Sequence, residues 1–286
     1  KHTESIKDSL NISKIPDNVY KEITDLNHIK EQNYLTGCFD ERYGVVNTLK
    51  IDSIIRENTN CILGDVDSEK KIVLMGDSYA HHWLGPVELL AEKYSYKLIH
   101  YSAANCKFKY YDKDIAIKDK EKEECSLFRK EVFKQIEEIE PDIIIYSDIT
   151  KSNKKPKYFK DFMVKLKNLS KNVFWIQTDF LFADYEYSSN NPTACLIENR
   201  NDIQKCTLST VYDSENRKLV EDYKLETQAA KDVGVHVLNL TDLFCYENKC
   251  PALINNISVY RKSHISNYYL MSIMNLIEDR FDLLKY

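Results

Sequence analysis

Short runs of β-forming residues recur along the chain, each followed after a break by apolar residues at helical spacing. The runs cover residues 72–75, 96–101, 143–146, 173–176 and 235–239. They are too short for helices and are typical of strands buried in a parallel sheet. Strands and helices that alternate in this way predict an α/β fold, with a doubly wound, mainly parallel five-stranded sheet and helices on both faces.

The apolar spacing also predicts where the helices lie. The first follows the 72–75 strand at once, because apolar residues recur from Tyr79 to Ala91. Further helices are expected near residues 19–26, 128–139, 159–166 and 212–231, with a last one from about His264 to Phe281. Residues 107–124 are interpreted as a polar surface excursion. Residues 178–209 are interpreted as a long loop, either a surface insertion or a wall of an acceptor groove.

The chain is long enough for one large α/β domain or two small ones. With 286 residues, we expect a lead-in or linker over residues 1–35 and the main domain over residues 36–286. No apolar run approaches the roughly 18 residues that a membrane-spanning helix needs. The chain begins with Lys1 and not with methionine. It is therefore interpreted as an excised portion of a longer protein or as a mature form.

Charge excludes one class of partner. The 40 basic side chains are dispersed among 45 acidic ones, and the net charge is −5. A nucleic-acid-binding protein would be expected to gather its basic residues in a patch or stripe. Nucleic acid is therefore not expected as a partner.

The eight cysteines fall in four couples along the chain. Local coupling predicts the disulfides Cys38–Cys61, Cys106–Cys125, Cys195–Cys206 and Cys245–Cys250, and with them an oxidising compartment. Zinc binding is the alternative, but no Cys-x-x-Cys occurs and no cysteine lies at ligand spacing from His81 or His82. No metal and no cofactor is expected.

Ser78 stands at the junction between the first strand and the first helix, in the segment Gly76-Asp77-Ser78-Tyr79-Ala80. Open α/β sheets place their sites at the carboxyl ends of strands, and a helix start favours developing negative charge. Ser78 is thus well placed to be a nucleophile. The alternative is that Asp77 and Ser78 only cap the helix, since both are preferred at that position.

A second segment, His264-Ile265-Ser266, favours the nucleophile role of Ser78 over helix capping. Gly-Asp-Ser after the first strand, together with a histidine opening the last helix, resembles the SGNH hydrolase superfamily. The closest resemblance is to the extracytoplasmic SGNH domain of bacterial surface-glycan O-acetyltransferases, from about Cys38 to the end of the chain. It implies that Ser78 is acylated, that His264 is its base, and that the two meet at the carboxyl edge of the sheet.

The resemblance also implies a reaction and its setting. The domain would move an acetyl group onto a bacterial surface polysaccharide, such as lipopolysaccharide or capsule. A membrane-embedded acyltransferase domain or protein would supply the acetyl group. The chain would then be extracytoplasmic, on the periplasmic or cell-surface side, and tethered to the membrane through a region that precedes it.

Two positions depart from the family pattern. The family's Gly-x-Asn-Asp block is missing, so the oxyanion donors expected here are the N–H of Ser78 and the side chain of Asn105. The family aspartate three residues before the histidine is replaced by Arg261, which cannot accept a hydrogen bond. Asp242, Asp179 or a backbone carbonyl are the candidates for orienting His264.

Three functions remain open from the sequence. The chain is an O-acetyltransferase, a carbohydrate esterase that uses water as acceptor, or a catalytically impaired glycan-binding domain that keeps the fold. Transfer and hydrolysis differ in how the acceptor site excludes water, which the sequence does not reveal. Arg261 is the main argument for the third function. His81 and His82 are alternative bases, but they lie further along the helix that Ser78 begins.

Overall fold

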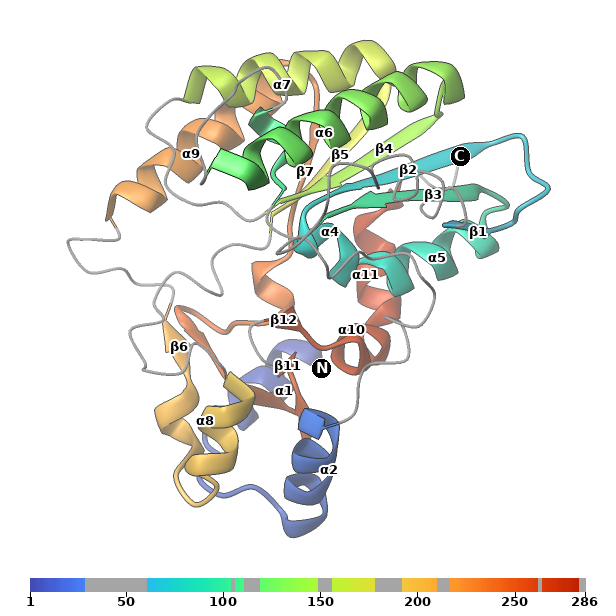
Figure 1. Ribbon diagram of the computed structural model, residues 1–286. Helices are drawn as coiled ribbons and strands as arrows, with labels where there is room; N and C mark the ends of the chain where they lie inside the picture. The colour runs from blue at the N-terminus through green and yellow to red at the C-terminus, as the bar shows by residue number, and fades with distance from the viewer. Residues whose placement is uncertain are drawn as a thin grey trace. The chain divides into compact units, whose positions relative to one another are not determined.

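The computed structural model describes residues 1–28, 61–103, 106–110, 119–148, 156–177, 192–209, 217–261 and 264–282 (Figure 1). The chain forms two compact units, each built from separate stretches of sequence. Unit 1 contains residues 1–32, 177–220 and 239–282, and unit 2 contains residues 33–176, 221–238 and 283–286. The predicted boundary between residues 35 and 36 lies outside the described residues and stays a prediction.

Unit 2 holds a six-stranded sheet in the order β1-β3-β2-β4-β5-β7. The predicted strands are confirmed as β2 (Lys71–Gly76), β3 (Lys97–Ser102), β4 (Ile143–Ser147), β5 (Asn172–Gln177) and β7 (His236–Asn239). β3, β2, β4 and β5 pair in parallel. The sixth strand, β1 (Ile62–Gly64), was not predicted. It pairs antiparallel with β3 at the edge, and its three residues are too few to show a periodicity.

Helices cover both faces of this sheet, as predicted (Figure 1). On one face lie α6 (Asp119–Ile139), α7 (Pro156–Leu169) and α9 (Arg217–Asp232), whose apolar side chains share one core with Val73, Met75 and Trp175. On the other face lie the short α4 (Ser78–His82) and α5 (Leu84–Lys93). Successive strand residues point to opposite faces.

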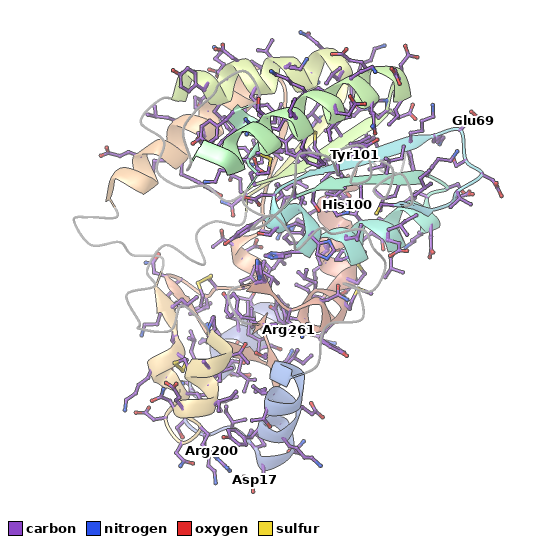
Figure 2. The ribbon with its side chains drawn as sticks, viewed as in Figure 1. Asp17, Glu69, His100, Tyr101, Arg200 and Arg261 are labelled. Carbon is purple, nitrogen blue, oxygen red and sulfur yellow. A yellow bond between two sulfur atoms is a disulfide. The ribbon has the colours of Figure 1, made fainter. Side chains whose placement is uncertain are left out.

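Strand β3 shows this alternation directly. Tyr101 donates a hydrogen bond from its hydroxyl to Gln135 of α6 (2.8 Å), and the ring of its neighbour His100 packs against His81 of α4 (Figure 2). β2, between β3 and β4, is buried over its whole apolar length. The carboxyl end of β2 is therefore held on both sides.

Unit 1 consists of short elements tied together by hydrogen bonds. The Thr193 hydroxyl donates to the Tyr260 carbonyl (3.0 Å), the Tyr269 hydroxyl donates to the Leu243 carbonyl, and Arg200 pairs with Asp17 (Figure 2). Its helices are α1 (His2–Ser9), α2 (Asp17–His28), α8 (Pro192–Glu198), η5 (Ile203–Cys206), η6 (Thr241–Leu243), α10 (Asn267–Ser272) and α11 (Met274–Arg280). Its strands are β6 (Leu208–Ser209), β8 (Lys249–Cys250), β9 (Leu253–Ile254), β10 (Ile257–Ser258), β11 (Tyr260–Arg261) and β12 (His264–Ile265).

Three expectations about local structure are wrong. The predicted long loop contains α8 and η5, because Leu196 and Ile203 bury apolar side chains there. The predicted final helix does not begin at His264, which lies in β12. Helix α10 begins after Ser266, its N-cap residue, and a break at Ile273 separates it from α11.

The third concerns the predicted surface excursion after β3. Its first residues form a buried 3₁₀ turn, η3 (Phe108–Tyr110), in which Phe108 belongs to the core of unit 2. Lysine side chains on both sides of Phe108 made this segment resemble a surface loop, although both are buried.

The predicted cysteine pairing is confirmed for the couples that the structure describes. Cys106 is bonded to Cys125, Cys195 to Cys206 and Cys245 to Cys250. Cys61 is also disulfide-bonded, and its predicted partner, Cys38, lies outside the described residues. No helix in the described part of the chain is both long enough and apolar enough to cross a membrane.

Candidate active site

Ser78 lies where β2 ends and α4 begins. Asp77 is the N-cap residue of α4, and its carboxylate accepts the N–H of Tyr79 (2.9 Å), so the predicted capping role holds for Asp77. Ser78 is the first residue of the helix and is only partly buried. α4 ends at His82, and α5 starts after Trp83. The expected single helix is therefore two short helices.

Gly76 permits this junction because β2 and β4 approach closely there. A Cβ atom on Gly76 would lie 1.8 Å from the carbonyl oxygen of Ser147 and 2.9 Å from Cβ of Ala80. Its φ angle of +153° is also one that glycine adopts more readily than other residues. The absence of a side chain at Gly76 thus lets Ser78 follow the strand immediately.

The carboxylate of Asp148 holds the junction from the neighbouring strand. Asp148 directly follows β4, and its Oδ1 accepts the backbone N–H of Asp77 (2.6 Å). Its Oδ2 accepts the N–H of Phe108 (2.7 Å) and the hydroxyl of Tyr146 (2.7 Å). One buried side chain therefore ties together the segments that follow β2, β3 and β4.

The environment of Asp148 changes its acidity. Burial raises the pKa of Asp148 to about 8, and the nearby Asp77 carboxylate adds to the rise. The Tyr146 hydroxyl and the ammonium groups of Lys109 and Lys107 act in the opposite direction. Burial and the charge of Asp148 likewise raise the pKa of Tyr146 well above its ordinary value.

The segment around Phe108 is fixed at several points. The Cys106–Cys125 disulfide joins it to α6, and the Arg129 guanidinium donates to the Lys107 carbonyl (3.0 Å). Lys109 forms an ion pair with Glu226 of α9 (3.5 Å), with side chains only 2% and 1% exposed. A buried ion pair needs good geometry to offset the cost of desolvation. The Phe108 amide is thus held facing Asp148.

His264, the predicted base, lies in unit 1. It belongs to the two-stranded ladder of β11 and β12, in which Tyr260 pairs with Ile265 and Arg261 pairs with His264. Directly opposed residues point to the same face of a ladder, with Cβ atoms about 4.5–5.5 Å apart. Arg261 is therefore the cross-strand neighbour of His264.

The other predicted site residues have mixed outcomes. Asn105 and Asp179 lie outside the described residues, and their roles stay predictions. Asp242 lies in η6, where its carboxylate accepts a hydrogen bond from Arg280. His81 and His82 are buried in α4. Within the described residues, no group of histidine, cysteine and acidic side chains is arranged to hold a metal ion.

Asp148 is the residue of this region whose role the sequence did not suggest. The available signal was an aspartate two residues after the apolar run Ile143–Tyr146, at the carboxyl end of a predicted buried strand. The contact to Asp77 joins residues 71 positions apart, which no local pattern reveals.

A serine that follows the inner parallel strand of such a sheet, with helices on both faces, is the arrangement of an SGNH-type α/β protein. Residues 47–279 match the family described as SGNH domain (fused to AT3 domains). The chain belongs to this family.

The fold is similar to that of a protein with a solved structure. That structure is the periplasmic domain of a lipopolysaccharide acetyltransferase from Salmonella ser. Paratyphi A. The similarity covers 92% of this chain and 97% of the other, at a TM-score of 0.58 and 14% sequence identity. At this identity the comparison supports the fold alone. The comparison with curated protein sequences gives no match.

Proposed function

We propose that this chain is an O-acetyltransferase domain that carries an acetyl group on Ser78 and passes it to a hydroxyl of a bacterial surface polysaccharide. The observation that carries the proposal is the place of Ser78 in a member of the SGNH family. Ser78 is partly exposed at the carboxyl end of an inner strand, where Gly76, Asp77 and Asp148 hold the backbone.

In the first half of the proposed reaction, His264 takes the proton of the Ser78 hydroxyl as its Oγ attacks the acetyl carbonyl carbon. The carbonyl oxygen becomes an oxyanion. The N–H of Ser78 and the side chain of Asn105 are its proposed donors. The intermediate then collapses, the bond to the donor's oxygen breaks, and His264 returns the proton to that leaving group.

In the second half, His264 takes a proton from the acceptor hydroxyl, which attacks the acetyl-serine carbonyl carbon. The bond to Ser78 Oγ breaks, and the proton returns to Ser78. The described hydrogen bonds support the choice of Ser78 as a donor. The N–H of Asp77 binds Asp148 and that of Tyr79 binds Asp77, whereas no acceptor within the described residues takes the N–H of Ser78 between them.

The partner and location are part of the proposal. Family members are fused to AT3 domains, which supports a membrane acyltransferase domain or protein as the acetyl donor. The three described disulfides, Cys106–Cys125, Cys195–Cys206 and Cys245–Cys250, favour an oxidising, extracytoplasmic compartment. The proposed acceptor is lipopolysaccharide, capsule or a similar glycan.

An activated ester tests the serine mechanism without partner or acceptor. With p-nitrophenyl acetate, we expect the wild type to release p-nitrophenol and to gain an acetyl mass on the peptide that contains Ser78. Ser78→Ala should abolish both signals, and His264→Ala should lose most of the rate. Equal rates for the wild type and Ser78→Ala, without an acetyl adduct, would exclude the proposal.

One observation favours a different function. The place of Arg261 opposite His264 puts a cation where a carboxylate would orient the imidazole. If no acyl-serine forms, a glycan-binding domain is the better interpretation. If it forms, an esterase is separated from a transferase by adding acetyl-free polysaccharide to the acylated protein. A transferase acetylates the polysaccharide, whereas an esterase releases acetate at an unchanged rate.

A further inference from the structure

We propose that Asp148 is a positioning residue for Ser78, whose buried carboxylate ties the backbone amide that precedes the nucleophile to the amide of Phe108 after β3. This inference rests on the proposed role of Ser78. In this role Asp148, which follows β4, acts neither as nucleophile nor as base.

The geometry sets Asp148 apart from an ordinary buried side chain. Asp148 Oδ1 accepts the amide next to Ser78 in sequence, and Oδ2 accepts the amide of Phe108 after β3. β3 and β4 flank β2 on its two sides. A single carboxylate therefore sets the spacing of three neighbouring strand ends at the edge where Ser78 lies.

The choice of a carboxylate has a chemical reason. Three donors point at Asp148, namely two backbone amides and the Tyr146 hydroxyl. Above about pH 8, where Asp148 is ionised, its carboxylate accepts at both oxygens. An asparagine amide accepts only at one and would turn N–H groups toward the other donors. An asparagine of the same shape would thus leave one of the two anchored segments without its acceptor.

The rest of unit 2 holds these donors in place. Phe108 is buried in the core, the disulfide of Cys106 lies two residues before it, and the buried pair of Lys109 and Glu226 follows it. The anchor on the other side is Asp77, which also caps α4. Displacement of Asp148 would thus shift the backbone at Ser78, because the segment around Phe108 keeps its other attachments.

The same strand offers a matched control. Asp142, which precedes β4, accepts the N–H of Lys71 at the start of β2 (2.7 Å) through Oδ2. This is the same kind of bond between an aspartate beside β4 and the backbone of β2, at the opposite end of the strands. Asp142→Asn removes a carboxylate from the sheet without touching the edge that carries Ser78.

The test is the pre-steady-state burst of p-nitrophenol release, with p-nitrophenyl acetate in excess over the protein and at a pH above about 8, where Asp148 is ionised. The burst gives both a rate constant and an amplitude. For Asp148→Asn we expect a rate constant about 10- to 100-fold below that of the wild type, with burst amplitude and KM little changed, because misplacement lowers the rate at each folded site. Asp142→Asn should keep the wild-type rate. A variant that is merely unstable loses amplitude and keeps its rate constant.

Each result decides the inference. A wild-type rate constant in Asp148→Asn overturns the positioning role and leaves the proposed function intact. Absence of Ser78-dependent acylation in the wild type overturns both. If Asp148→Asn does not fold, Tyr146→Phe removes one donor to the same carboxylate. A smaller fall in its rate constant at unchanged amplitude supports the inference, and an unchanged rate constant overturns it.

Discussion

Arg261 is the side chain that faces His264 across the β11–β12 ladder. At the cross-strand distance of about 4.5–5.5 Å between Cβ atoms, a carboxylate at this position has the reach to hold the imidazole of His264. A guanidinium has only donors and cannot accept the imidazole N–H. If His264 is the base, as proposed, Arg261 therefore affects the orientation of its imidazole and leaves the fold of the ladder intact.

Substitution of Arg261 tests this effect on His264. Arg261→Asp should raise kcat/KM for p-nitrophenyl acetate at least about tenfold, since an orienting carboxylate contributes up to about four orders of magnitude in a serine protease. Arg261→Ala is the control, because it removes the cation without supplying an acceptor. An aspartate variant no faster than the alanine variant would show that another group orients His264.

Gly76 gives a prediction about stability. Gly76→Ala places a methyl group 1.8 Å from the Ser147 carbonyl oxygen, so β2 and β4 must separate at the site. We expect a loss of more than about 4 kcal/mol in the free energy of unfolding, measured by urea denaturation, or no soluble protein.

Gly234→Ala is the matched control for Gly76. Gly234 also has a positive φ, +76°, but a Cβ atom there meets only the Lys167 side chain at 4.0 Å. Gly234→Ala should lower the free energy of unfolding by only roughly 1–2 kcal/mol, which is the cost of a strained backbone. Equal losses at the two glycines would mean that backbone conformation, and not the close approach of β2 and β4, explains Gly76.

The buried ion pair of Lys109 and Glu226 joins η3 to α9. Removing one partner of such a pair leaves an uncompensated charge in the core. Glu226→Gln should therefore lower the free energy of unfolding by about 3 kcal/mol or more in urea denaturation. The exposed pair of Lys165 and Glu137 (3.3 Å) is the control, and Glu137→Gln should cost at most about 1 kcal/mol. A Glu226→Gln variant as stable as Glu137→Gln would contradict the prediction.

At the scale of the whole molecule, Asp148 links stability to pH. Because its pKa is raised to about 8 in the folded protein, the folded state binds more protons than the unfolded state between about pH 4 and pH 8. The free energy of unfolding should therefore fall as pH rises from about 4 to about 8. The stabilisation from protonated Asp148 is fully present only below about pH 4. Urea midpoints at pH 5, 6.5 and 8 measure the effect.

Asp148→Asn should flatten this dependence, since the side chain no longer titrates. Burial and Lys167 lower the pKa of His236, which gives an opposite slope near its ordinary pKa. The comparison between wild type and variant removes the contribution of His236, because both proteins keep it. An identical pH dependence in the two proteins would show that Asp148 keeps its ordinary pKa.

Local sequence determined five of the six strands of the unit 2 sheet and the parallel pairing of β3, β2, β4 and β5. The runs around Ile72, Ile143 and Val173 are apolar on both faces, as a strand covered by helices on both sides must be. The three described disulfides followed from the spacing of the cysteines. The Ser78 junction followed from a strand, a glycine and a cap residue in succession. Each of these features depends on neighbours within a few residues or on a loop closed locally.

Tertiary structure decided the rest. Two features depend on partners far away in sequence, so local periodicity does not predict them. They are the burial of Phe108 between two lysines and the hydrogen bond from the Asp77 amide to Asp148. The extended conformation of His264 is set by its ladder with Arg261, which overrides the helical spacing of the residues that follow. The position of Ser78 between a strand and a helix could be predicted from the sequence because it needs only one local junction. The support of that junction requires three strand ends to meet, which only the tertiary structure decides.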